Sequence, residues 1–384
     1  MLSLRRSFFL LTLIVSGWFL SVFPVYADTT SSVEIMNTSF ENTPQEVYMR
    51  AEVVNILEDG EQDVDGEKQP FQKVTLEILN GDEKGKQIIV DHGKSFVVHG
   101  FKKVKKGDLV VVTKPAFAAR EDIYYIVDHY RGTNLFIVIT FFFVLAIIFG
   151  KKRGIMAIIG MLFSAGVIFY FMAPRILAGG NPLLISVLGG IIILIFSLYI
   201  SHGFNKRTSI ALASSLLTLG FAVVIDILFV SFCSLTGAGT EESFFLQTNM
   251  GSIDLKGLLL GGIIIGVLGI LDDITTAQVA TVEEVAKANR YLTCSELYKS
   301  GLSVGREHIA SLVNTLVLAY VGASFPLILL YSASQNMPLW LLFNNNFIAE
   351  EIVRTIVGSS ALIVAVPITT MLAAYFYQAK VRQN

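Results

Sequence analysis

Long runs of apolar residues occupy most of the chain after residue 131, and each is close to the roughly 20 residues that a bilayer requires. Another apolar run, 8–23, follows a pair of arginines and precedes the sequence PVYA, whose small residues suit signal peptidase. Residues 1–27 are therefore predicted to be either a cleaved signal peptide or a first transmembrane helix. Seven further spans are predicted, at residues 135–150, 154–173, 182–200, 209–235, 256–273, 309–332 and 352–377.

Basic residues cluster after alternate spans, which sets the expected orientation. If residue 28 lies outside the cell, every cluster falls inside, as the positive-inside rule requires. The prediction is an extracellular segment 28–131, a transmembrane block 132–384 with a cytoplasmic loop 274–305, and a cytoplasmic C-terminus. The clusters comprise Lys151, Lys152, Arg153, Lys206, Arg207, Lys287, Arg290, Lys299, Arg306, Lys380 and Arg382.

The polar segment 28–131 has short β-rich runs separated by turn sequences such as Asn80-Gly81, where glycine supplies a positive φ. Five or six short strands of this kind favour a small closed barrel of OB or SH3-like size. An open antiparallel sheet with the same strands is the alternative. The predicted strands are Val47–Leu57, Val74–Leu79, Gln87–Val90, Ser95–Val98, Asp108–Val112 and Asp122–Val127.

Three loops carry patterns of their own. Thr281–Glu284 and Thr293–Glu296 both fit the T-x-x-E capping box, which predicts short surface helices in the cytoplasmic loop. The acidic residues at 61–65 imitate half of an EF-hand loop, but Gln72 stands where the bidentate glutamate should be. An acidic hairpin loop is therefore favoured. The sequence 337–343 is too short to cross a bilayer and suits an interfacial segment.

Composition agrees with an integral membrane protein. The 384 residues are 53% hydrophobic and only 16% charged, and the net charge of -2 gives no argument for nucleic acid. The two cysteines, Cys233 and Cys294, fall on opposite sides of the expected membrane, so a disulfide is not expected. No enzyme signature and no metal-ligand spacing is present, so we expect no enzyme activity, no cofactor and no metal site.

The run from Gly257 to Gln278 combines glycines with two adjacent carboxylates. Gly262, Gly266, Gly269 and Asp273 share one helix face, which predicts a close contact with another helix. Asp272 and Asp273 lie about 24 Å along their span at 1.5 Å per residue, near its cytoplasmic edge. They either end the span in headgroup water or line an ion or proton path as an inner gate.

Asp226 lies deeper, with apolar sequence on both sides, so it should face the interior of the bundle. Ser215, Thr218, Ala222 and Asp226 follow one helix face, which predicts a polar or small stripe. A plain interhelical hydrogen bond is the simpler interpretation. The alternative is a buried protonatable group on a transport path.

Three further features belong to the helical block. Asn314 either serves helix packing or forms a hydrogen bond to Asp272 or Asp273, because consecutive helices leave the inner loop. Glu350 and Arg354, four residues apart, are expected to form a local ion pair. Proline residues 326 and 367 should kink their helices.

The stretch 269–331 resembles the YibE/F-like family of bacterial multispan membrane proteins, with the closest resemblance in LDDITTAQ and GREHIASLVNTL. The resemblance extends to the outer β-domain before the helical block, and it implies no particular activity. The order of the acid-bearing helix, the inner segment and the next span is also similar to SecF and RND-type transporters, as an analogy only.

Two functions follow from these patterns. The first is a permease-like or ion-coupled transport protein in the bacterial cell membrane, with Asp226, Asp272 and Asp273 as candidate protonation or cation sites. The second is an envelope scaffold or binding module that the spans only anchor. The expected partners are the lipid bilayer and a second membrane protein or another copy of the chain.

Overall fold

We describe residues 47–64, 67–93, 102–115, 123–249, 251, 253–333 and 338–381 of a computed structural model of the chain. The chain divides into two compact units, residues 1–141 and 142–384, and each is described by itself. The predictions for residues 1–27 and for the strand Ser95–Val98 lie outside the described residues.

The first unit contains a small antiparallel sheet. Its strands are β1 (Val47–Val64), β2 (Glu67–Ile78), β3 (Gln87–His92), β4 (Leu109–Lys114) and β5 (Tyr125–His129), in the order β3-β2-β1-β4-β5. Alternate residues point into one core that includes Ala51, Val53, Leu76 and Val110, all with no exposed surface. The end strands β3 and β5 approach each other, but no hydrogen-bonded ladder joins them among the described residues.

The acidic segment near residue 63 is a hairpin, as expected. The ladder of β1 and β2 pairs Gly60 with Phe71 and continues through Asp63 opposite Lys68. An EF-hand would need a loop with converging oxygen ligands in place of this ladder. The EF-hand interpretation is therefore excluded.

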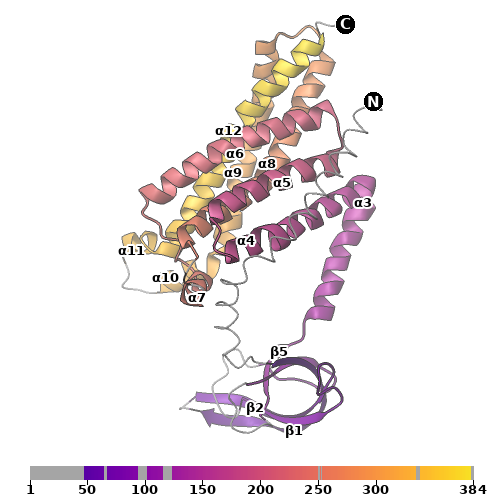
Figure 1. Cartoon of the computed structure of the whole chain (residues 1–384), viewed down its shortest axis with the longest axis vertical. Helices are drawn as coiled ribbons and strands as arrows, with labels where there is room; N and C mark the ends of the chain where they lie inside the picture. Colours follow the sequence, from indigo (N-terminus) through magenta and orange to yellow (C-terminus); the bar gives the residue numbers. More distant parts are fainter. Residues whose placement is uncertain are drawn as a thin grey trace. The chain divides into compact units, whose positions relative to one another are not determined.

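The second unit is helical (Figure 1). Its longer helices are α3 (Gly132–Gly166), α5 (Pro182–His202), α6 (Lys206–Phe232), α8 (Leu255–Ala288), α9 (Cys294–Ala323) and α12 (Asn346–Val381). The shorter elements are the π-helix η2 (Val167–Met172), α4 (Ala173–Leu177), α7 (Glu241–Asn249), α10 (Phe325–Ala333) and α11 (Leu339–Phe343).

Among the described residues, five helical stretches are long and apolar enough to cross a membrane, judged by length and composition. The count of seven is not confirmed. The first stretch, Gly132–Leu177, contains two of the predicted spans, and its backbone breaks at Lys151, which has φ 50° and ψ -131°. The span predicted at 309–332 is not among the five, because it is divided between α9 and α10 at Ser324, beside Pro326. The other four stretches are Pro182–His202, Lys206–Phe232, Leu255–Ala288 and Asn346–Gln378.

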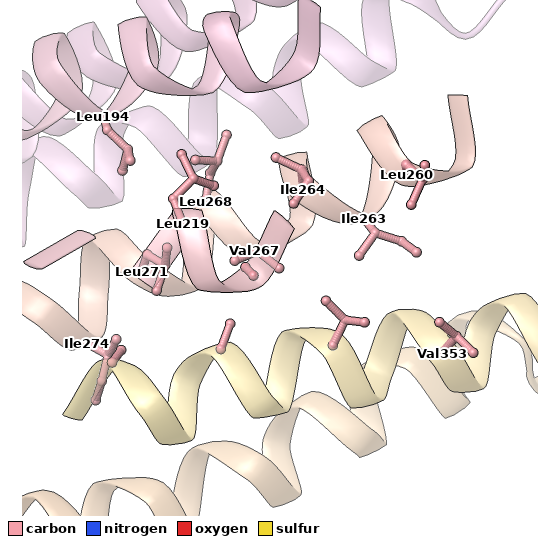
Figure 2. Close-up of a cluster of buried hydrophobic side chains, with 14 of the residues drawn as sticks. Leu194, Leu219, Leu260, Ile263, Ile264, Val267, Leu268, Leu271, Ile274 and Val353 are labelled. Carbon is pink, nitrogen blue, oxygen red and sulfur yellow. The ribbon is translucent and has the colours of Figure 1, made fainter. Parts of the chain in front are cut away.

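Helix α8 lies at the centre of the bundle and packs against α5, α6, α9 and α12. Figure 2 shows its apolar side chains from Leu260 to Ile274 between Leu194 of α5, Leu219 of α6 and Val353 of α12. At about 1.5 Å per residue its 34 residues reach about 51 Å, longer than the roughly 30 Å hydrocarbon core. The element that carries Asp272 is therefore one continuous helix well past that residue.

The prediction of a separate inner loop at 274–305 is accordingly wrong for its first half, which is part of a long helix. Residues 274–288 continue α8 and bury Val279 and Val282 against Leu297 of α9 and Ala373 of α12. Thr281 begins no helix, because it lies inside α8 and its hydroxyl donates to the Ala277 carbonyl. The second capping box is confirmed at the start of α9.

Candidate functional site

The polar stripe predicted on α6 is buried in the bundle. Ser215, Thr218, Ala222 and Asp226 have no exposed surface. The Ser215 hydroxyl shares a hydrogen bond of 2.9 Å with the hydroxyl of Thr275 on α8, and Thr218 donates to the Ser214 carbonyl at 2.9 Å. Every hydroxyl in the stripe therefore has a partner, and only its carboxylate is left.

Asp226 has neither carboxylate oxygen in a hydrogen bond within the part of the chain that the structure describes. Among the described residues, the positive charge that acts on Asp226 is Arg354 of α12. A buried carboxylate without a hydrogen bond is expensive, so the group must take up a proton or a cation, or move toward a donor. The simpler interpretation of Asp226 as an interhelical hydrogen bond is not supported by this geometry.

Arg354 is bound to Glu351 and not to the predicted Glu350. Its Nη1 donates to Glu351 Oε1 at 3.2 Å, three residues away on the same helix. The Nε of Arg354 and the Oε2 of Glu351 are both buried without a partner. Thus the guanidinium keeps a donor free on α12, the helix that packs against α6.

Glu350 does not form the predicted ion pair with Arg354 and binds instead the loop before α7. Its side chain is 5% exposed and accepts hydrogen bonds from the backbone N–H groups of Gly237 and Gly239. A Cβ at Gly239 would lie 2.7 Å from Glu350 Oε2, so the loop approaches this closely only as glycine. We call Asp226, Glu350, Glu351 and Arg354 the Arg354 cluster.

Asp272 and Asp273 line a separate cavity of about 860 Å³, which we call the basic cavity. Asp272 is half-buried, and its Oδ2 accepts a hydrogen bond of 3.1 Å from Ser197 of α5, while its Oδ1 has no partner among the described residues. Asp273 is exposed. The basic lining consists of Arg153, His202, Lys206, Arg207 and Lys287.

Both lysines of this lining already have partners within the chain. Lys206 donates to the Phe376 carbonyl at 2.6 Å, and Lys287 pairs with Glu284 at 2.8 Å. Arg153 and Arg207 are exposed at the cavity. A cavity with acids on α8 and guanidinium groups at its rim suits the entry of a polar solute or ion.

The structure does not bring Asp226 and Asp272 together. Thr208 of α6 lines the basic cavity, and Asp226 lies 18 residues later on that helix, about 27 Å away at 1.5 Å per residue. Between the level of the basic cavity and the level of Asp226, α6 and α8 contribute to the apolar core of Figure 2 and form the Ser215–Thr275 hydrogen bond. The candidate acids therefore form two sites at different depths.

Asn314 does not reach either aspartate. It is exposed on α9 and makes no hydrogen bond among the described residues. Gly305, nine residues earlier, packs against Val366 of α12, and nine residues at 100° each place Asn314 on the opposite side of α9. Of the two roles considered for Asn314, the hydrogen bond to Asp272 or Asp273 is therefore not supported by this geometry.

The glycine face predicted for close packing is turned outward within this chain. Gly262 and Gly269 are exposed, and an added Cβ would meet nothing within 4 Å. Gly266 faces the hydroxyl of Tyr320, 3.3 Å from the position of such a Cβ. The close helix contact within this chain is at Gly261, which precedes Gly262 and therefore points about 100° away from it around α8. A Cβ at Gly261 would collide with Ser186 of α5.

Sequence reasoning missed the residue that joins three helices. Gln278 of α8 is fully buried, and its Nε2 donates to the Gly301 carbonyl of α9 at 2.9 Å and to Thr370 of α12 at 2.7 Å. The sequence feature that could have indicated Gln278 is the pair Gly301 and Gly305, four residues apart on α9. Two glycines at this spacing mark the helix face that another helix can approach closely.

Comparison with known proteins gives one finding. No curated protein and no solved structure matches this chain. The family model described as YibE/F-like protein matches residues 138–379, which include α5 to α9 and nearly all of α12, and with them Asp226, Asp272 and Arg354. The chain belongs to the YibE/F-like family.

Proposed function

We propose that this protein is an ion-coupled membrane transporter and that Asp226 is its ion-binding carboxylate. The observation that carries the proposal is the complete burial of Asp226 with both oxygens unpartnered. Ionisable groups inside a membrane bundle are costly, and they occur chiefly where an ion or proton passes. A structural role would be served better by a hydroxyl or an amide.

The basic cavity supports the same proposal at the other level of the bundle. Asp272 and Ser197 lie at the wall of a volume large enough for a small polar solute or a hydrated ion. We place the inner access at this cavity, and the binding step at Asp226. A path between them has to open along the stripe that includes Thr218 and Ser215.

We propose a topology to match. The break at Lys151 divides α3 into two spans, and α9 together with α10 forms another. With α5, α6, α8 and α12 this gives seven crossings. The clusters at Lys151 to Arg153 and at Lys206 and Arg207 then lie in the cytoplasm of a bacterial cell, with residues 28–131 outside and the C-terminus inside. The sheet of the outer domain is proposed to close into a barrel through the approach of β3 to β5.

The lipid bilayer and a second copy of the chain are the proposed partners. The exposed face of Gly262 and Gly269 is where a helix of another copy would approach most closely. In this account the chain carries out transport without a catalytic step. An envelope scaffold, anchored by its helices, is the competing function.

Reconstituted vesicles separate the two functions. We expect vesicles with the parent protein to take up protons or monovalent cations faster than protein-free vesicles when a gradient is imposed. Asp226→Asn should remove this flux, since the amide keeps the shape of the side chain and loses the charge. Asp272→Asn should reduce it, and Glu242→Gln, an exposed acid on α7, is the matched control.

A scaffold gives a different result. If the parent vesicles take up ions no faster than protein-free vesicles under any imposed gradient, with the protein correctly folded and oriented, the transport proposal fails.

A further inference from the structure

The Arg354 cluster is short of positive charge. It holds three carboxylates and one guanidinium, and two of the acids, Asp226 and Glu350, are buried. Five of its side-chain atoms are buried without a hydrogen-bond partner in the described structure: both oxygens of Asp226, one each of Glu350 and Glu351, and Arg354 Nε. Such a concentration of unsatisfied charged atoms indicates a site with a missing ligand or a second arrangement.

A metal cation suits Asp226 poorly. Hard cations prefer several oxygen ligands, and no group of three His, Cys, Asp or Glu residues in the part of the chain described here converges on one point. The charge that acts on Asp226, that of Arg354, is also positive and would repel a metal ion. A proton needs only one oxygen and no coordination shell.

The other charged groups near α6 do not replace Arg354. Helix α12 contributes Glu350 and Glu351, and α9 contributes Tyr320, whose hydroxyl lies between Gly266 and Gly358. On α8, Lys256 reaches only Ser231, at 3.2 Å, beyond Asp226 on α6. On α5 the titratable residues, Tyr199 and His202, lie at the opposite end of the helix.

We propose that the ligand of Asp226 is a proton, and that Arg354 leaves Glu351 to bind the Asp226 carboxylate when this proton departs. The inference rests on the proposed function and names its coupling ion. Asp226 loses the proton from one oxygen, the electron pair stays on that oxygen, and water accepts the proton. Arg354 stays protonated throughout, and only its hydrogen bond changes partner.

Arg354 is a positioning residue in this account. When Asp226 carries the proton, the neutral acid tolerates its apolar surroundings and Arg354 pairs with Glu351. When Asp226 is ionised, the free donor Nε of Arg354 supplies the missing hydrogen bond and charge. The two arrangements differ in the packing of α12 against α6, so protonation and helix position are coupled.

Carbodiimide labelling of the full chain in nanodiscs tests this directly. Dicyclohexylcarbodiimide reacts with protonated carboxyl groups in apolar surroundings, and mass spectrometry gives the labelled fraction of Asp226 at each pH. We expect labelling to increase as the pH falls. In Arg354→Gln the midpoint should rise by about 1 pH unit or more, because the ionised form loses its counter-charge.

Three controls sharpen the result. Arg354→Lys should recover part of the parent midpoint, and Lys256→Gln should leave it unchanged. Glu351→Gln should move it in the opposite direction, downward, because Arg354 is then released toward Asp226. This last variant keeps the test valid if Arg354→Gln does not fold.

The contrary outcomes are distinct. Protection of Asp226 by sodium ions, relative to choline at the same concentration, would overturn the proton as ligand. An unchanged midpoint in both Arg354→Gln and Glu351→Gln would overturn the exchange of Arg354. If the midpoints shift but the parent vesicles show no flux, the coupling of the two residues stands and the transport function fails.

Discussion

At the level of one residue, Asp226 is the polar side chain of its helix face that lacks a hydrogen bond. Ser215 and Thr218 have hydrogen-bond partners and Ala222 is apolar, whereas neither carboxylate oxygen of Asp226 has a donor among the described residues. The group that can supply one, Arg354 of α12, comes 128 residues later in the chain.

Gly261 and Gly262 form a natural pair for testing the packing of α8. In Gly261→Ala the added Cβ meets Ser186 and the Pro182 carbonyl oxygen, so we expect a loss of about 1–3 kcal/mol in the free energy of unfolding. In the monomer, the Cβ of Gly262→Ala meets nothing, and the substitution should be neutral, or stabilising by up to about 1 kcal/mol through helix propensity. Thermal unfolding in detergent measures both.

No loss in Gly261→Ala would contradict the contact of Gly261 with Ser186. A loss in Gly262→Ala as large as that in Gly261→Ala would show that the proposed helix of another copy already packs over Gly262 in detergent.

His92 makes the stability of the β-domain depend on pH. The imidazole is 8% exposed on β3, and burial lowers the pKa of His92 below its ordinary 6.5. A hydrogen bond to the Lys102 backbone opposes this lowering, and His129 adds to it. The folded domain then binds fewer protons than the unfolded one, so its stability falls as the pH drops below about 6.5. Hydrogen exchange of β2 and β3, corrected for intrinsic rates, should show this loss between about pH 7.5 and pH 5.5.

The variant His92→Gln has no ionisable group there and should flatten the pH dependence. His202→Gln, in the helical unit, should leave it as in the parent. A parent domain equally protected at both ends of this range would show that His92 does not titrate on unfolding.

At the level of elements, the start of α9 is set by its capping box. Thr293 Oγ1 accepts from the Glu296 N–H, and Glu296 Oε2 accepts from the Thr293 N–H at 2.8 Å. Thr293→Ala should cost about 1 kcal/mol and increase hydrogen exchange in the first turn of α9. Thr281→Ala, at the first T-x-x-E sequence, should change stability by no more than about 0.5 kcal/mol, because half-buried Thr281 lies inside α8 and caps no helix end.

A larger effect at Thr281 than at Thr293 would place the start of a helix at 281 and contradict the continuity of α8.

These two sites also show how far the elements could be predicted. Most strand and helix positions followed from apolar periodicity and turn residues, including the break beside Pro326. The length of α8 did not, because Gln278 and Thr275 look like the polar end of a span until their partners on α9, α12 and α6 are known. Local sequence patterns indicate which residues can cap a helix or form a turn. Tertiary contacts decide which of these residues actually do so.

At the level of the whole chain, the helical unit carries its two groups of acids at different depths. The Arg354 cluster lies near the end of α6 and the start of α12, and the basic cavity lies near the start of α6 and the later part of α8. The sequence predicted different depths for Asp272, from helix arithmetic, and for Asp226, from its apolar flanks, and the structure holds the two residues apart. The contacts of Asp272 with Ser197 and of Arg354 with Glu351 needed the fold.

Proton flux through Asp226 is the central claim. It is tested most directly by the initial rate of proton uptake into vesicles that contain equal amounts of folded parent or Asp226→Asn protein, under an imposed pH gradient. The account predicts uptake by the parent, and a rate for the variant no different from that of protein-free vesicles. A variant that takes up protons as fast as the parent would contradict it.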